Sequence, residues 1–253
     1  MTMNELFINR IRLNDMPPKS SYLSRLPVVK NLHSIEQGLE LTSNITFLVG
    51  ENGIGKSTLL EAIAVNYGFN PEGGSRNFNF HTRESHSELH RSLLLTKGYR
   101  RARDGYFLRA ESFYNVASNI DELDEIPAAA PSIISSYGGT SLHKQSHGES
   151  FFALIFNRFG GNGLYILDEP EAALSATRQL SLIIRLNELA KNGSQFIIAT
   201  HSPLLIATPG SQVISITEDA IETTPYELTE NYIVTKRFLS DPAAMLDQLI
   251  DDK

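Results

Sequence analysis

The hydrophobic residues of this chain gather in short runs, each followed directly by glycine or by polar residues. The clearest runs are residues 45–49, 164–167 and 196–199. Largely apolar runs of four or five residues are typical of strands that are buried on both faces of a parallel sheet. Residues that follow such strands gather at one edge of the sheet, so the pattern predicts an α/β fold with its functional groups at that edge.

Helices and further strands are predicted around these runs. After residues 45–49, apolar residues recur at helical spacing until Gly68 ends the pattern: Leu59, Leu60, Ile63, Ala64 and Tyr67. Residues 6–13 alternate like a strand. Residues 14–43, broken early by Pro17-Pro18, are expected to form an irregular antiparallel edge, and a second helical segment is expected through residues 87–95.

The octapeptide GENGIGKS, between the first strand and the first helix, has the spacing of a phosphate-binding P-loop. Gly50 and Gly55 let the backbone wrap closely around a polyphosphate, so that main-chain N–H groups and the helix N-terminus face its charge. Lys56 is expected to reach the β- and γ-phosphates, and the Ser57 hydroxyl to ligate Mg²⁺. The predicted cofactors are therefore ATP and Mg²⁺, and the predicted nucleotide-binding residues are Gly50, Glu51, Asn52, Gly53, Ile54, Gly55, Lys56, Ser57 and Thr58.

Asp168, Glu169 and His201 follow the other two strands. Asp168 is the expected Mg²⁺ partner, and Glu169 is placed to orient and polarise the attacking water. His201 is a candidate sensor of the γ-phosphate. Taken alone, the two carboxylates could form a solvated turn or a helix cap, and the histidine could be an ordinary loop residue. Their shared sheet edge with the P-loop favours an ATPase site in which Lys56, Glu169 and His201 are the catalytic groups.

Over roughly 150 residues, the order of these motifs resembles that of the ATP-binding-cassette (ABC) ATPases. The matching segments are the P-loop, a signature-like Ser-His-Gly-Glu at 146–149, Asp168-Glu169, a D-loop-like stretch at 171–175, and His201. The resemblance implies a P-loop fold with a mainly parallel sheet, an antiparallel β edge and a small helical lobe. It also implies an ATP-dependent homodimer in which Ser146, Gly148 and Glu149 of one copy contact the γ-phosphate held by the other. Without the family, Ser146 and Glu149 form a helix capping box.

The residues of two of these motifs, DEPEAALS and THSP, are similar to those of the soluble SMC, RecF and OLD-like branch of the family, whose members act on DNA or in defence. Three departures stand out: Ser175 replaces an aspartate, His147 replaces a glycine, and no glutamine lies between Lys56 and Gln145.

Two roles that the family assigns have only candidate residues here. Glu111 is the candidate for the missing Q-loop glutamine, with Arg109 as a possible phosphate or carboxylate partner; a surface ion pair is the alternative. Tyr22 is the candidate for stacking on adenine, with a packing role as the alternative.

Composition favours a single domain. The 253 residues are 41% apolar and can bury one large core. The resemblance implies that they form one ABC-type ATPase domain, with an ATP lobe at 1–110 and 150–253 and a helical lobe at about 112–148. Zero cysteines exclude disulfides and thiolate metal sites. No apolar run approaches the ~20 residues that span a bilayer, and the start lacks a signal-peptide layout, so a cytoplasmic protein is expected. The 111–146 interval is too short for coiled-coil arms.

Charge bears on the choice of partner. A net charge of −7 argues against broad nucleic-acid binding, apart from a basic stretch at 97–103 that is either a nucleic-acid contact or a solvated face. The sequence thus predicts an ATP-hydrolysing motor or switch that acts on DNA or on a partner protein in repair or defence. The alternatives are the ATP-binding subunit of a transporter with a separate membrane protein, and a nonhydrolytic ATP switch.

Overall fold

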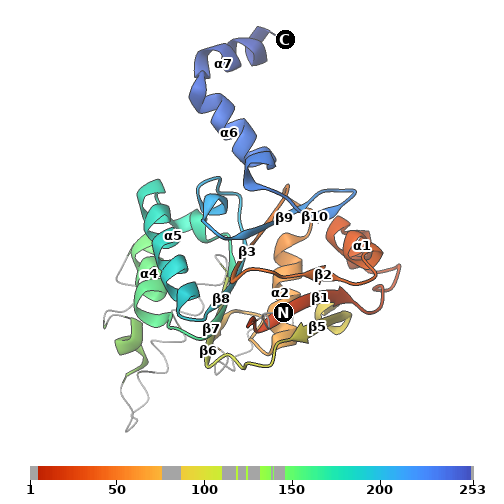
Figure 1. Cartoon of the computed structure of the whole chain (residues 1–253), viewed down its shortest axis with the longest axis vertical. Coiled ribbons are helices and arrows are strands. Elements are labelled where there is room, and N and C mark those ends of the chain that lie inside the picture. The colour runs from red at the N-terminus through yellow and green to blue at the C-terminus, as the bar shows by residue number, and fades with distance from the viewer. Residues whose placement is uncertain are drawn as a thin grey trace.

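The computed structural model describes residues 5–75, 87–109, 132–137 and 146–251, together with positions 118, 124 and 139. Its described part consists of two β-sheets with helices around them, and two C-terminal helices that rise from this body (Figure 1). The predicted α/β fold class is confirmed.

The larger sheet holds the three predicted strands at its centre. Its described strands run in the order β10 (Ile221–Thr223), β9 (Gln212–Ile216), β3 (Ile45–Val49), β8 (Gln195–Ala199), β7 (Gly163–Asp168), β6 (Asp104–Arg109) and β4 (Gly74–Ser75). The strands from β9 to β6 are parallel, whereas β10 and β4 are antiparallel additions at the two edges. The carboxyl ends of β3, β8, β7 and β6 therefore meet at one edge, as the sequence pattern predicts.

The smaller sheet is antiparallel and has the order β2 (Leu39–Glu40), β1 (Ile8–Leu13) and β5 (Leu93–Lys97). β1 confirms the predicted strand. The prediction of a helix through residues 87–95 is wrong beyond its first turn, because only a 3-10 helix, η2 (Glu88–Arg91), precedes β5. Leu93 and Leu95 are buried while Leu94 is 46% exposed. This alternation suits a strand paired with β1, and that pairing decides the local structure.

The segment at 14–43 is more regular than predicted. It contains the 3-10 helix η1 (Tyr22–Arg25), the helix α1 (Pro27–Ser34) and β2. Pro27 occupies the first turn of α1, where its missing N–H costs nothing, and Val28 and Leu32 recur one helical turn apart on the buried side. Only β2 matches the expected antiparallel edge.

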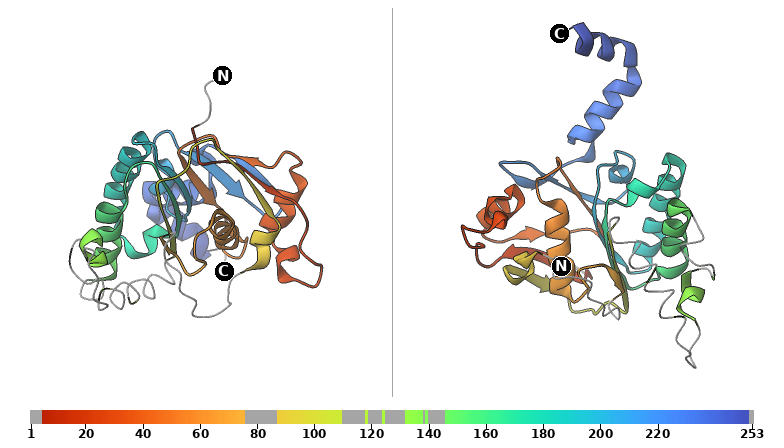
Figure 2. Two further views of the ribbon diagram at one scale, coloured as in Figure 1. Left: turned by 90° about the horizontal axis from the view of Figure 1, so that it is seen from below. Right: turned by 180° about the vertical axis from the view of Figure 1, so that it is seen from behind.

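Two apolar cores lie on the two faces of the larger sheet. The first surrounds α2 (Lys56–Tyr67), which lies between the sheets and is viewed along its axis in the left part of Figure 2. The second packs the sheet against α4 (His147–Ala153), the following π-helical turn η5 (Leu154–Arg158) and α5 (Ala176–Lys191). Along β3, Leu48 faces the first core, while Phe47 and Val49 face the second. Both faces of β3 are thus buried, which explains its apolar sequence.

One buried side chain joins the two sheets. The Gln195 side chain, at the start of β8, accepts hydrogen bonds from the backbone N–H groups of Phe7 (2.8 Å) and Ile8 (2.9 Å). Its amide nitrogen donates to the Ile8 carbonyl oxygen at 2.9 Å. Because Gln195 has no exposed surface, water does not replace these three bonds, and the start of β1 depends on them.

The C-terminal helices α6 (Glu230–Ser240) and α7 (Pro242–Asp251) extend beyond the body (Figure 1). None of the helices in the described ranges has both the length and the apolar character needed to cross a membrane.

Replacing Gln195 by methionine tests the link between the sheets. Gln195→Met keeps the length of the side chain but leaves two N–H groups and one carbonyl buried without partners. We expect the free energy of unfolding to fall by about 3 kcal/mol, measured by urea denaturation with circular dichroism at one protein concentration. Gln37→Met, at an exposed position, is the control and should change it by less than about 0.5 kcal/mol. A loss below about 1 kcal/mol for Gln195→Met would show that the link is dispensable.

Candidate functional site

The P-loop lies between β3 and α2 and is supported from outside by α1. Gly55 has φ 101° and caps α2, and a Cβ at this position would lie 2.5 Å from Cγ1 of Val28. The Val28 N–H also donates to the Ile54 carbonyl oxygen at 3.2 Å. Only glycine satisfies both the backbone angle and the close contact. The sequence analysis missed this supporting role of α1.

A cavity of about 410 Å³ opens over the P-loop. It is lined by Leu26, Asn52, Gly53, Gly55, Lys56, Ser57, Thr58 and Glu169. The N-cap of α2 is Gly55, which has no side chain to accept from the first N–H groups of the helix, so these groups can face an anion. The predicted nucleotide-binding loop therefore has the geometry of a phosphate cradle.

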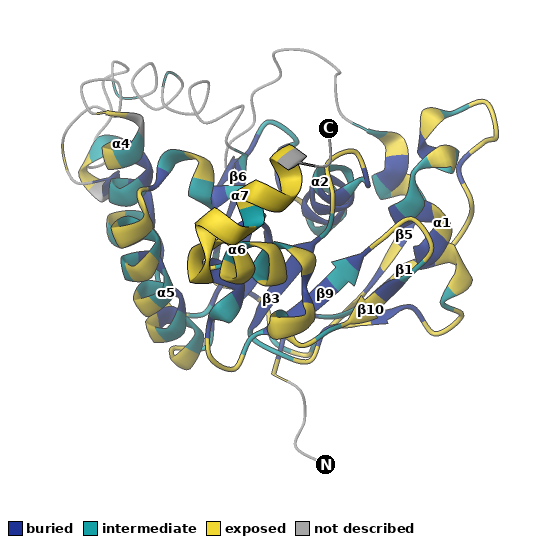
Figure 3. Cartoon of the chain, turned by 90° about the horizontal axis from the view of Figure 1, so that it is seen from above, coloured by how far each residue is buried: buried dark blue, intermediate teal, exposed yellow. Residues whose placement is uncertain are grey.

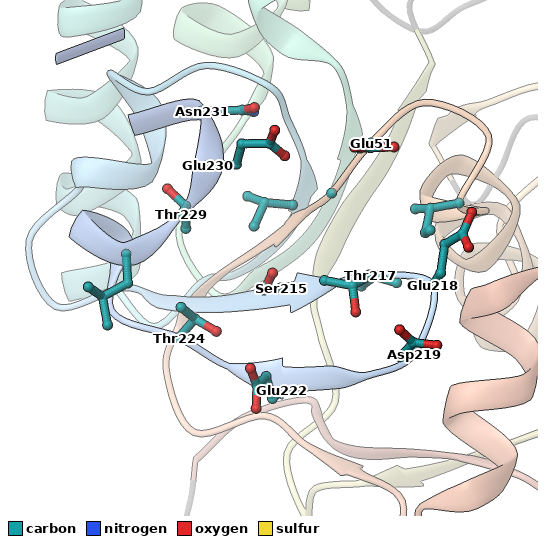
Figure 4. Close-up of a pocket in the computed structure, with 15 residues that line it drawn as sticks. Glu51, Ser215, Thr217, Glu218, Asp219, Glu222, Thr224, Thr229, Glu230 and Asn231 are labelled. Carbon is teal, nitrogen blue, oxygen red and sulfur yellow. The ribbon is translucent and has the colours of Figure 1, made fainter. Parts of the chain in front are cut away.

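A larger cavity of about 590 Å³ lies beside the start of the P-loop, between β9, β10 and the first turn of α6 (Figure 4). Five carboxylate side chains line it: Glu51, Glu218, Asp219, Glu222 and Glu230. Such a lining repels a triphosphate. The smaller cavity is therefore the better candidate for the nucleotide.

Lys56 is buried beneath the P-loop. Its ammonium group donates to the carbonyl oxygens of Gly50 and Glu51, both at 2.8 Å. Burial lowers the pKa of Lys56 below its usual value, and the negative charges of Glu169 and Asp168 oppose that shift. The side chain thus lies in the loop that is expected to hold the phosphates.

The two predicted Mg²⁺ ligands meet although 111 residues separate them. The Ser57 hydroxyl donates to Oδ1 of Asp168 at 3.0 Å. Asp168 is the last residue of β7, and its register partners are Ala199 on β8 and Arg109 on β6. A hydroxyl and a carboxylate are oxygen ligands of the kind that Mg²⁺ prefers. This donor pair fits the predicted metal ion.

Glu169 and His201 come together at the same edge. Nε2 of His201 lies 3.8 Å from Oε1 of Glu169, which is too long for a hydrogen bond. This nitrogen is buried and has no hydrogen-bond partner among the residues that the structure describes. Glu169 also adopts the left-handed conformation, with φ 49°, which is uncommon for a residue with a side chain. Strain of this kind is found where a functional side chain must point in one direction.

Two residues that the sequence analysis did not assign to the site hold the backbone of His201. Its N–H donates to Oε1 of Glu171 at 2.6 Å, and its carbonyl oxygen accepts from the side-chain amide of Asn231 at 3.0 Å. Glu171 lies in the D-loop-like stretch. Asn231 belongs to α6, and nothing in the local sequence marks it as a neighbour of His201.

The signature-like residues start α4 and form the predicted capping box. Oε2 of Glu149 accepts from the backbone N–H of Ser146 at 3.0 Å and from its hydroxyl at 2.6 Å. These hydrogen bonds hold the pKa of Glu149 below its usual value. A Cβ at Gly148 would lie 2.6 Å from the Ala173 carbonyl oxygen, so close packing within the chain already explains this glycine. None of the three predicted residues lines the P-loop cavity of its own chain.

The structure describes two of the three residues considered for the Q-loop and adenine-stacking roles, namely Arg109 and Tyr22. Arg109 forms an ion pair at 2.6 Å with Glu61 of α2, and the two side chains are only 24% and 8% exposed, so the pair is partly buried. Tyr22 is 60% exposed and does not line the P-loop cavity, so its stacking role stays a prediction and a packing role is not supported. Glu111 lies outside the described residues, as does most of the expected helical lobe.

Two cations of the basic stretch at 97–103 contact other residues of the chain. Arg100 pairs with Glu5 at 3.0 Å and also hydrogen bonds to Asn162. The ammonium of Lys97 lies 4.9 Å from the centre of the Tyr67 ring. These two cations are therefore not simply solvated.

Two family models match the sequence. The first is described as "AAA domain, putative AbiEii toxin, Type IV TA system" and matches residues 81–207, half of the chain. The second is described as an AAA domain and matches residues 28–126. No curated protein sequence matches the chain.

Solved structures with a similar fold include a metal-chelate type ABC transporter in an inward-facing conformation. It has a TM-score of 0.45 and 14% identity, over 90% of this chain and 88% of that chain. Another is cbiO1 from Clostridium perfringens, part of the ABC transporter complex cbiONQ, with a TM-score of 0.46 and 15% identity over 96% of this chain and 99% of that chain. Similarity at this level carries no argument about what the chain does.

The family match covers the strands that end in Arg109, Asp168 and Ala199, and the P-loop geometry completes the same sheet edge. The chain therefore belongs to this AAA-domain family and has a P-loop fold.

Proposed function

We propose that the chain binds ATP with Mg²⁺ at the P-loop and hydrolyses it in a dimer that encloses the nucleotide between two copies. The contact between the Ser57 hydroxyl and Asp168 carries this proposal, because it places both predicted metal ligands at the N-terminus of α2. Glu169 lines the same cavity and His201 lies beside it.

The roles of the residues follow from their positions. Lys56 and the N–H groups of α2 neutralise phosphate charge. Ser57 and Asp168 would hold Mg²⁺, which would neutralise more of that charge when bound. Glu169 orients a water molecule and accepts its proton as the oxygen attacks the γ-phosphorus. The bond from the γ-phosphorus to the β,γ-bridging oxygen breaks, and ADP leaves with that oxygen. His201 Nε2, which has no hydrogen-bond partner in the described part of the chain, hydrogen bonds to the γ-phosphate or to the water.

The cavity of one copy supports a dimer because it is lined without the signature-like residues. Ser146 is exposed at the start of α4. In the proposed dimer this helix N-terminus approaches the nucleotide bound to the other copy, where its N–H groups face the γ-phosphate. The carboxylate of Glu149 accepts two hydrogen bonds from Ser146, and these bonds weaken its repulsion of the phosphate.

The energy of this cycle would act on DNA or on a partner protein. The description of the matched family names a type IV TA system, which supports the defence side of the predicted role. Any contact with nucleic acid would use the basic stretch at 97–103, where Arg101 and Arg103 are exposed.

Glu169→Gln tests the proposed hydrolysis. This change keeps the shape of the side chain but removes the base, so the ATPase rate should fall at least about 100-fold while ATP affinity is kept. ATP should also trap the variant as a dimer, seen by size-exclusion chromatography with light scattering. Lys56→Ala should instead lose ATP binding, measured by calorimetry.

The control for both variants is Glu36→Gln, at an exposed position, which should behave as wild type. Equal and negligible rates for wild type and Glu169→Gln would refute hydrolysis and favour a nonhydrolytic switch. Retained ATP affinity in Lys56→Ala would refute the site itself.

Asn231→Ala tests whether α6 positions His201. Loss of one hydrogen bond to the His201 carbonyl should lower kcat about 5-fold with little change in KM, which corresponds to about 1 kcal/mol. In a His201→Ala background the same change should have no further effect, because its target is gone. Asn187→Ala, which removes a side-chain bond within α5, is the control. Additive losses in the double variant would contradict the coupling.

A further inference from the structure

Helices α6 and α7 carry apolar surface that the described chain leaves uncovered. Figure 3 shows most of both helices as exposed, and no residue from 230 to 250 is buried. Large apolar side chains on and just before these helices are 38–70% exposed: Leu228, Ile233, Val234, Phe238, Leu239, Leu246, Leu249 and Ile250. Their concentration in one segment of about two dozen residues separates this face from scattered exposed apolar residues.

Helices of this length need a packing partner. α6 has 11 residues and α7 has 10, and isolated helices shorter than about 12–15 residues are marginal in water. The bond between Arg237 and Gln248, at 2.8 Å, joins the two helices but is exposed. Burial of an apolar face is what normally stabilises such helices. Among the described residues, Tyr232 of α6 packs against the second core, whereas the large apolar side chains further along α6 and α7 stay exposed.

We propose that the apolar face of α6 and α7 docks against the same face of a second copy of this chain. With roughly 150–200 Å² for each fully exposed apolar side chain, the eight exposures amount to on the order of 800 Å². That is about the area that each partner buries in a standard protein–protein interface. The surface is therefore large enough for a stable dimer.

The charges of the two helices are complementary to each other. α6 carries Lys236 and Arg237 in its second half and Glu230 at its start, whereas α7 carries Asp247 and Asp251 and no basic residue. In a two-fold symmetric interface, each copy offers the same surface to the other, so α6 of one copy can lie on α7 of its partner with opposite charges facing. Self-complementarity of this kind favours a second copy over an unrelated protein.

An apolar cavity at the base of α6 gives the interface a pocket. It has a volume of about 320 Å³ and is lined by Pro203, Leu204, Tyr232, Thr235, Lys236, Leu239 and Ser240. An apolar side chain of the second copy would fill it. Pockets filled by apolar anchors are where interfaces gain most of their binding energy.

Lipid and nucleic acid fit this face poorly. Residues 230–253 contain three basic and five acidic residues, so their net charge is −2. Helices that lie on anionic membranes carry lysine and arginine on their polar face, and nucleic-acid contacts need clustered cations.

The proposed dimer differs from the nucleotide-sandwich dimer because it needs no ATP. Both would be compatible in one assembly: α6 starts at the edge that holds His201, through Asn231. Two copies joined at α6 and α7 would keep a second signature-like segment near each P-loop and raise its effective concentration.

Light scattering of the purified full chain without nucleotide tests the inference. Wild type at about 50 μM should be a dimer, and Leu239→Glu/Leu249→Glu should be a monomer. The circular dichroism spectrum of this variant should match that of wild type, apart from any loss of helix in α6 and α7. Ile184→Glu is the matched control, because Ile184 is 71% exposed on α5 and lies outside the proposed face. It should remain a dimer.

Cross-linking gives a second readout that does not depend on charge. The chain has no cysteine, so Leu239→Cys/Leu249→Cys carries one thiol on each of the two helices and Ile184→Cys carries a single thiol. Because α6 of one copy would lie on α7 of the other, a short bis-maleimide should join two chains of the double variant at least 10-fold more efficiently than two Ile184→Cys chains.

Three results would overturn the inference: a wild-type monomer without nucleotide, a dimer that survives both glutamate substitutions, or equal cross-linking of the two cysteine variants. Binding of a different protein by a monomeric chain, lost in the glutamate variant, would also replace the second copy as the occupant. The ATP-trapped dimer of Glu169→Gln is tested separately in the Leu239→Glu/Leu249→Glu background, where the chain without nucleotide is expected to be a monomer. The failure of one dimer then leaves the other open to its own test.

Discussion

The hydrogen bond between Ser57 and Asp168 is the contact on which the site depends. It joins the N-terminus of α2 to the carboxyl end of β7 across 111 residues. The contact exists because β3, β8 and β7 are neighbouring parallel strands whose ends are level. A slip of one residue in β7 would turn the Asp168 side chain to the opposite face of the sheet. The apolar faces of β7, buried in both cores, therefore fix the position of a polar group.

The surrounding structure holds this edge from three directions. α1 packs on Gly55 of the P-loop, and Gln195 joins the strand β8 to the smaller sheet. Glu171 accepts a hydrogen bond from the backbone N–H of His201, and Asn231 donates one to its carbonyl oxygen. Because Asn231 belongs to α6, a movement of the C-terminal helices reaches the predicted γ-phosphate sensor through a single hydrogen bond. This connection gives α6 and α7 a physical route to the site.

The sequence predicted the parts of the structure that local pattern decides. Strands β3, β7 and β8 were visible because both of their faces are buried, and the P-loop because its chemistry requires fixed spacing. α1 was missed since its apolar residues, Val28 and Leu32, span little more than one helical turn. The run Leu93–Lys97 was ambiguous until its pairing with β1 was known. Asn231 had no local signal at all, because its role comes from a contact with His201 that only the tertiary structure creates.

The charge balance of the cavity bears on the proposal that two copies complete the site. Among the described residues that line the cavity, Lys56 is the only basic side chain, and Glu169 adds a negative charge. A triphosphate brings about four negative charges, which one ammonium and one helix N-terminus, worth about half a charge, do not neutralise. A divalent cation at Ser57 and Asp168 supplies two more positive charges. Part of the negative charge of the triphosphate would still lack a counter-charge. In the proposed dimer, the N-terminus of α4 from the second copy would offer N–H donors to the γ-phosphate without adding a basic side chain. The acidic composition of the chain is thus compatible with nucleotide binding, provided that the site is assembled from a metal ion and two copies.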